Sequence, residues 1–114
     1  MGLTLLTSAI HFLDNAFRLD LYPGPAWLTR NIVMLAWLVL PAFALLAWRS
    51  GSRLALVAYG LLGFAGLGHY WAAHHSSMTG AALHGAMPVR CAVTIWGEAV
   101  ASVVLLGYVL VWRE

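Results

Sequence analysis

Five strongly polar side chains could form one chemical site inside a bilayer if the chain crosses it four times. They come from three of the four apolar stretches: His11, Asp14, Asn15, His69 and Glu98. At a helix rise of about 1.5 Å per residue, these side chains lie at similar depth. That depth is in the half of the bilayer nearest to the connection between the third and fourth apolar stretches. Ionisable groups at such a depth cost several kcal/mol each unless they face a partner, water or a ligand. The layer is therefore a candidate site.

Acid–base chemistry is what these residue types predict. Glu98, kept protonated by burial, would act as the acid, with His11 or His69 as the base. Asp14 would orient the other groups or stabilise positive charge. Isomerisation, or cyclisation started by protonation, of an isoprenoid would need no cofactor from such a site.

A purely structural interpretation accounts for the same residues one at a time. Asp14 can neutralise Arg18 one helical turn away, a common arrangement near a helix end. His11 can be an interior histidine that donates to a backbone carbonyl or to Glu98, and Glu98 can be a neutral hydrogen-bonding group. Agreement in depth across three helices is what favours the functional interpretation.

The connection between the third and fourth apolar stretches suggests metal binding as an alternative to acid–base chemistry. Within 23 residues it gathers histidines, methionines and the lone cysteine, the ligand types that suit copper: His74, His75, His84, Met78, Met87 and Cys91. His74, His75 and His84 are the candidate metal ligands, although no spacing here matches a defined motif. A haem held axially by His11 and His69 is a further possibility.

Composition places the chain in a membrane. It has 62% hydrophobic and 9% charged residues, against about 25% charged residues in soluble domains, and its mean hydropathy is +0.84. Six arginines and no lysine are scattered along its 114 residues, so no basic face for nucleic acid is present. Cys91 has no second cysteine with which to form an internal disulfide.

Four apolar segments are long enough to cross the hydrocarbon, which needs about 20 residues. They span about residues 3–21, 26–48, 53–73 and 89–112, divided by a Pro-Gly turn, a Ser-Gly-Ser turn and the longer His-rich connection. The sequence therefore predicts one polytopic domain over residues 1–114, an all-α integral membrane bundle of four transmembrane helices. An even number of crossings puts both termini on one side. If Arg18 belongs to the polar face of the first helix, more of the remaining arginines lie on the side of the termini than on the opposite side. Because arginines gather on the cytoplasmic side, this favours cytoplasmic termini in a prokaryotic inner membrane.

Two polar stripes predict which helices meet. On the first helix the polar residues recur at steps of three and four: Thr4, Ser8, His11, Asn15 and Arg18. The fourth helix repeats the pattern: Cys91, Thr94, Glu98 and Ser102. Because a lipid-facing polar stripe is costly, helices one and four should face each other or a shared cavity. Four glycines of the third helix predict a close packing surface: Gly60, Gly63, Gly66 and Gly68.

Parts of the first half resemble a known family. AIHFLDNAFRLDLYP and PAWLTRNIVMLAWLVLPAFALLAWRSGS are similar to the four-helix EXPERA membrane proteins, which include emopamil-binding sterol isomerases and the sigma-2 receptor. The resemblance implies a lipid-facing pocket with buried acids for a sterol-like or cationic amphiphilic ligand, and Asp14 is the acid that carries over. The segment 26–48 holds no acidic residue, where the receptor-like members place one.

The leading hypothesis is a small membrane protein whose polar pocket binds a small lipophilic, isoprenoid or sterol-like molecule. It either binds that molecule or also isomerises or cyclises it. The alternatives are a haem- or copper-binding protein, or an accessory subunit of a larger membrane complex whose polar stripes only lock helices together. The expected partners are the lipid bilayer, the ligand and further copies of the chain or a larger complex.

Overall fold

The computed structural model describes residues 1–22, 24–72, 78–79 and 89–111. Its elements run in the order α1 (Gly2–Phe17), η1 (Leu19–Leu21), β1 (Gly24–Pro25), α2 (Arg30–Ser50), α3 (Arg53–Leu62), η2 (Ala65–Leu67), α4 (Gly68–Ala72), β2 (Met78–Thr79) and α5 (Val89–Val111). The described chain is helical apart from the antiparallel pairing of the two-residue strands β1 and β2. The predicted all-α class is confirmed.

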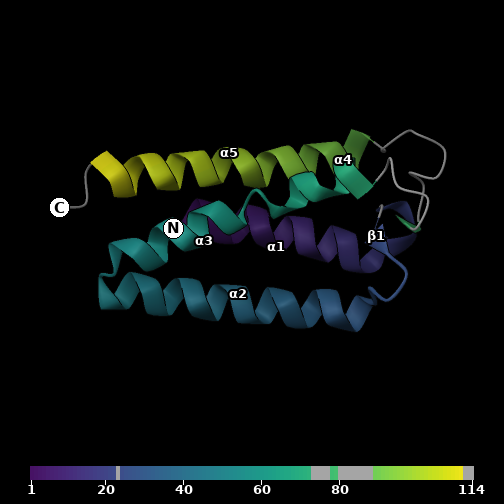
Figure 1. The fold of residues 1–114 in the computed structure, drawn as a ribbon, viewed down its shortest axis with the longest axis horizontal. Coiled ribbons are helices and arrows are strands. Elements are labelled where there is room, and N and C mark those ends of the chain that lie inside the picture. Colours follow the sequence, from purple (N-terminus) through teal and green to yellow (C-terminus); the bar gives the residue numbers. More distant parts are fainter. Residues whose placement is uncertain (23, 73–77, 80–88, 112–114) are drawn as a thin grey trace.

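The long helices lie along one axis, with α2 and α5 on opposite sides and α1 and α3 between them (Figure 1). The α2–α3 turn and the end of α5 lie at one end of the molecule, and α1 begins on the same side, set back from that end. We call this the terminal end, and the opposite end, which carries β1, the loop end. The molecule measures 47 × 24 × 20 Å, which matches the roughly 40–45 Å of a bilayer with its headgroups.

Three helical segments are long and apolar enough to cross a membrane: Arg30–Ser50, Arg53–Trp71 and Val89–Val111. They correspond to the predicted second, third and fourth spans. The second begins four residues later than predicted, because the Thr29 side chain caps it by accepting a hydrogen bond from the Ile32 amide at 3.3 Å. It ends where Gly51 adopts a left-handed φ of 71°, a conformation that glycine tolerates best.

The first predicted span differs more. The α-helix α1 has 16 residues and ends at Phe17, and the rest of the predicted range 3–21 is the 3-10 turn η1. At about 1.5 Å per residue α1 is about 24 Å long, shorter than the roughly 30 Å hydrocarbon core. Its end is anchored because Arg30 Nε donates to the Ala16 carbonyl at 3.0 Å.

The third predicted span is interrupted. The helix α3 stops at Leu62, and the chain continues through η2 into the short helix α4. Glycines here are poor helix formers and permit close contact. A methyl group on Gly63 would overlap the Ser102 side chain, and one on Gly60 would lie 2.7 Å from Leu106 Cδ2. The glycine packing surface is thus confirmed at these two positions, against α5, whereas Gly68 has no neighbour within 4 Å of such a methyl.

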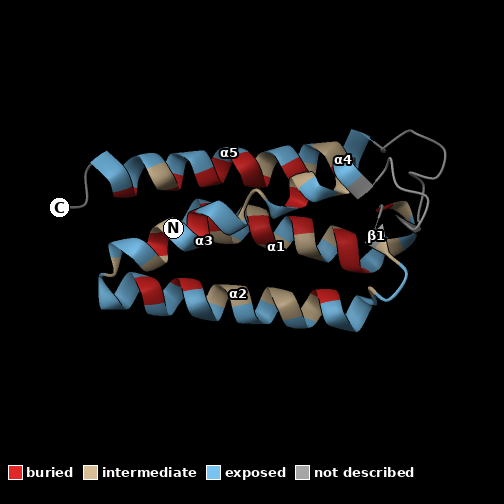
Figure 2. Cartoon of the chain, viewed as in Figure 1, coloured by how far each residue is buried: buried red, intermediate tan, exposed pale blue. Residues whose placement is uncertain are grey.

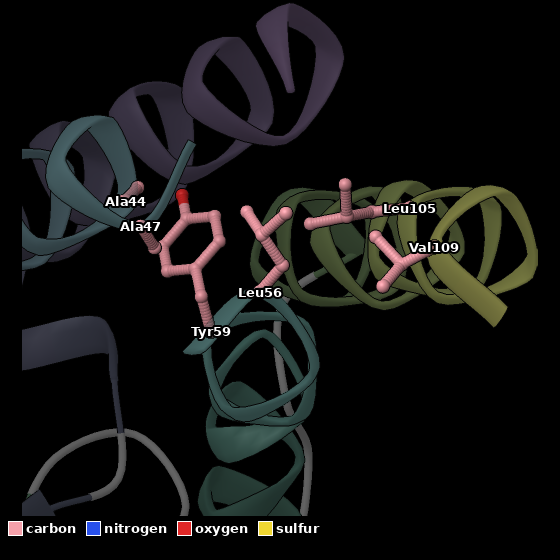
Figure 3. Packing of buried hydrophobic residues seen from close by; sticks show 6 residues of the cluster. All are labelled: Ala44, Ala47, Leu56, Tyr59, Leu105 and Val109. Atoms are coloured by element: carbon pink, nitrogen blue, oxygen red, sulfur yellow. The ribbon is translucent and has the colours of Figure 1, made fainter. Parts of the chain in front are cut away.

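Buried residues line the inner faces of all the long helices, while their outer faces are exposed and apolar (Figure 2). One apolar cluster joins α2, α3 and α5 near the terminal end (Figure 3): Ala44, Ala47, Leu56, Tyr59, Leu105 and Val109. A second cluster lies at the loop end and consists of Tyr22, Cys91 and Ile95. The candidate site lies between these two clusters.

Candidate functional site

The polar stripe of α1 supplies the centre of the site. Four of its side chains are buried, namely Thr4, Ser8, His11 and Asn15, and α5 adds Glu98 and Ser102. The opposite face of α1 is apolar and exposed: Leu3, Leu6, Ile10, Leu13 and Phe17. This division confirms that the polar stripes of helices one and four face each other.

His11 and Glu98 form a buried contact between α1 and α5. His11 Nε2 lies 3.9 Å from Glu98 Oε2, and the two side chains are only 4% and 8% exposed. Gly66 packs beside the imidazole, since a methyl group on Gly66 would be in ordinary contact with His11 Nε2, at 3.4 Å. The predicted acid and one predicted base are therefore brought together.

The other nitrogen of His11 begins a hydrogen-bonded chain. His11 Nδ1 lies 3.3 Å from Thr94 Oγ1, and Thr94 Oγ1 lies 2.7 Å from the Tyr22 hydroxyl. The Tyr22 hydroxyl in turn donates to Asp14 Oδ2 at 2.8 Å. Tyr22 is 2% exposed, and burial raises the pKa of its phenol well above the ordinary value. The phenol therefore stays neutral and serves as a hydrogen-bonding group.

Asp14 stands at the outer end of this chain. Its Oδ1 lies 3.3 Å from Arg18 Nε and 3.4 Å from Arg90 Nε. Asp14 is 13% exposed, whereas the arginine side chains are 44% and 49% exposed. The predicted pairing of Asp14 with Arg18 is confirmed, and Arg90 adds a second ion pair from α5.

His69 joins the group through Asn15. Asn15 Nδ2 lies 3.2 Å from His69 Nε2, and the His69 ring centroid is 5.7 Å from that of His11. The ring of Tyr22 is in contact with both imidazoles, at 5.6 Å from His11 and 5.1 Å from His69. The four predicted catalytic residues, Glu98, His11, Asp14 and His69, thus belong to one cluster.

A cavity of about 200 Å³ opens beside this cluster. Four polar side chains contribute to its wall, namely His11, Asn15, His69 and Glu98, and the rest of the wall is apolar, with Ile32, Val33, Ala36 and Leu40 supplied by α2. Two of its lining residues, Ile32 and Leu62, are themselves exposed on the apolar outer surface. An apolar pocket with a few convergent polar groups is the usual form of a small-molecule site.

The described residues bear in different ways on the two metal hypotheses, a metal site in the His-rich connection and a haem between His11 and His69. Within the described ranges no group of three His, Cys, Asp or Glu side chains is placed to hold a metal ion. His74, His75 and His84, with Met87, lie outside the described residues. The Tyr22 ring contacts both His11 and His69, the two residues of the haem hypothesis.

Three contributing residues were not predicted as parts of the site. Tyr22 was assigned to the first turn and Arg90 to the end of a span, while Thr94 was placed on the polar stripe without a role. Thr94 could have been found from its position one turn before Glu98 on that stripe. The role of Tyr22 depends on how the chain reverses after α1, which the spacing of residues does not reveal.

Comparison of the chain with protein-family models, with curated proteins and with solved structures gave no match. The EXPERA-type resemblance stays a prediction.

Proposed function

We propose that this protein is an integral membrane protein whose pocket binds a small lipophilic molecule and transfers a proton to it. The observation that carries the proposal is the cavity of about 200 Å³ with Glu98, His11 and His69 in its wall. Three apolar helices of membrane length support the membrane setting. The exposed apolar face of α1 supports a fourth, shorter crossing. A prokaryotic inner membrane with cytoplasmic termini remains part of the proposal.

The size of the cavity narrows the ligand. Sites that enclose a drug-sized molecule measure about 300–1,000 Å³, and a cavity of about 150 Å³ holds a benzene ring. The pocket therefore takes one end of an isoprenoid or sterol-like molecule. The remainder would lie against exposed apolar residues beside the pocket, such as Ile32 and Leu62, and so in the lipid.

In this mechanism Glu98 donates its proton to a carbon–carbon double bond in the pocket. The resulting carbocation loses a proton from a neighbouring carbon to His11 or His69, so that the double bond shifts without any change in oxidation state. Attack by a second double bond before that loss would give a ring instead. Asp14, which is connected to His11 by hydrogen bonds through Tyr22 and Thr94, would stabilise the positive charge on His11.

A pair of alanine substitutions on α2 tests the pocket. Ala36 lines the cavity, whereas Ala42 lies on the exposed outer surface. Farnesol at 100 times its dissociation constant should stabilise the native protein by about 2.7 kcal/mol. Ala36→Phe should abolish this gain and Ala42→Phe should keep it. Equal stabilisation of both variants by farnesol would contradict the pocket assignment.

Glu98→Gln tests the chemistry, because it keeps the size of the side chain and removes the acid. Conversion of farnesol to isomers or rings, followed by gas chromatography, should fall to the background level in this variant. The folded yield should be nearly unchanged. Unaltered conversion would show that Glu98 is not the acid.

A further inference from the structure

We propose that Tyr22, Thr94 and His11 form a proton path that connects Asp14 at the loop end with the buried Glu98. The inference extends the proposed function, because it gives Glu98 a route for exchanging protons with the loop end besides the imidazole that accepts the substrate's proton. The path uses two hydroxyl groups and one imidazole, all of which can accept a proton on one side and release one on the other. Its members come from α1, from the segment after η1, and from α5.

The contacts along the path allow two complete arrangements of protons. In the first, the Glu98 acid faces His11 Nε2, His11 Nδ1 donates to Thr94, Thr94 donates to Tyr22, and Tyr22 donates to the ionised Asp14. In the second, every donor points the other way, so that a protonated Asp14 donates to Tyr22 and His11 Nε2 faces an ionised Glu98. In each arrangement every hydroxyl donates one hydrogen bond and accepts one along the path, and the Thr94 hydrogen turns away from the Cys91 carbonyl, which lies 3.0 Å from Thr94 Oγ1 and competes for it.

Switching from the first arrangement to the second moves one net proton. Glu98 gives a proton to His11 Nε2, while His11 Nδ1 releases another to Thr94. Thr94 and Tyr22 each gain one proton and lose one, and Asp14 receives the last. The reverse sequence reloads Glu98 from Asp14, so atoms and charge balance in both directions. The step between His11 and Glu98, at 3.9 Å, needs closer approach or a bridging water.

The surroundings suit a path with one open end. Asp14 is partly exposed and its arginine partners reach solvent, so protons can enter there. Tyr22, His11 and Glu98 are buried, and the cavity beside His11 and Glu98 reaches the apolar outer surface at Ile32 and Leu62, so the hydrogen-bonded groups offer the route to water at the loop end. Among the described residues, the other titratable or charged groups packed around the path are Arg18, Arg90, His69, Cys91 and, beside Glu98, Tyr59.

Infrared spectroscopy of the protein in detergent micelles, without any ligand, tests the path. The carboxylic acid band of Glu98 is identified by its loss in Glu98→Gln. Its rate of shift is then measured after mixing with heavy water, which replaces the acidic proton by deuterium. Thr94→Val should slow this exchange at least tenfold, because valine keeps the shape but has no hydroxyl. Thr94→Ser should restore the wild-type rate.

Tyr22→Phe should slow the exchange to a similar extent, whereas Tyr70→Phe should not. Tyr70 is a matched control, since its hydroxyl accepts from Trp96 Nε1 at 3.0 Å outside the path. Exchange within twofold of wild type in both Thr94→Val and Tyr22→Phe would overturn the path and leave the proposed function standing. Absence of any Glu98 acid band in the wild type would overturn the proposed acid and the path together.

Discussion

Substitution of alanine for each glycine on the third span should reveal how closely α3 and α5 are packed. An added methyl on Gly63 would overlap the Ser102 hydroxyl and lie 2.9 Å from Ser102 Cβ. Side-chain rotation removes only the first clash, so the helices must separate, at a cost of about 1–3 kcal/mol for overpacking. At Gly68 nothing lies within 4 Å, and alanine should be neutral or stabilise by up to about 1 kcal/mol.

The remaining two glycines fall between these limits. At Gly66 the methyl would meet His11 Nε2 at 3.4 Å and Ile95 Cγ2 at 3.6 Å, an ordinary contact, so the change in stability should be small. At Gly60 it would meet Leu106 Cδ2 at 2.7 Å, but that is the flexible end of a leucine, which can rotate away. The expected order of destabilisation is therefore Gly63, Gly60, Gly66 and Gly68.

Equilibrium unfolding in mixed micelles, followed by circular dichroism, gives the four free energies. Ser102→Gly offers a matched rescue, because it removes both atoms that the Gly63 methyl would meet. The Gly63→Ala and Ser102→Gly pair should show a favourable coupling of about 1 kcal/mol or more in a double-mutant cycle. Coupling near zero, or Gly63→Ala as stable as Gly68→Ala, would refute the packing of α3 against α5.

Three other predictions concern the polar cluster. Burial raises the pKa of the Tyr22 phenol. The neutral phenol therefore stabilises the fold fully below about pH 10, where tyrosine titrates in the unfolded chain, and the free energy of unfolding falls by up to about 1.4 kcal/mol per pH unit above it. Tyr22→Phe should flatten this dependence of the free energy of unfolding, measured with denaturant, between about pH 9 and 11. Arg18→Gln and Arg90→Gln should each cost less than about 1 kcal/mol, whereas the double variant should cost more than their sum, because Asp14 loses both ion pairs. Cys91 is fully buried, so a maleimide should label it far more slowly in folded protein than in unfolded protein, as mass spectrometry can record.

Hydropathy and residue spacing predict much of this fold because they indicate which face of a single helix is buried. The described helix α5, Val89–Val111, lies within the predicted range 89–112, and the polar stripe of α1 was correctly turned towards α5. The break after Leu62 was not predicted, since Gly63 and Gly66 are compatible with both a continuous helix and an interrupted one. An added methyl on Gly63 would overlap Ser102, so the packing at this position depends on a residue of another helix.

The ionisable residues of the candidate site were predicted from the sequence, but the hydrogen bonds that connect them were not. Glu98, His11 and His69 stand out because charge and imidazole are rare in apolar segments. Tyr22 does not, because tyrosine is common at membrane interfaces and precedes a proline in this chain. Its hydroxyl reaches Thr94 only because the chain turns back through η1 after α1 ends.

The short connection between α1 and α2 therefore positions the site as much as the helices do. Arg30, the first residue of α2, bonds the Ala16 carbonyl near the end of α1 and lies over the Phe17 ring at 5.3 Å. This anchor fixes where α1 stops, and the turn that follows brings Tyr22 against α5 with almost no exposed surface. A longer α1 that continued through residue 21, as its apolar sequence permits, would carry Tyr22 farther along the helix axis from Thr94. The shortness of α1 is thus what joins Asp14 to His11 and Glu98.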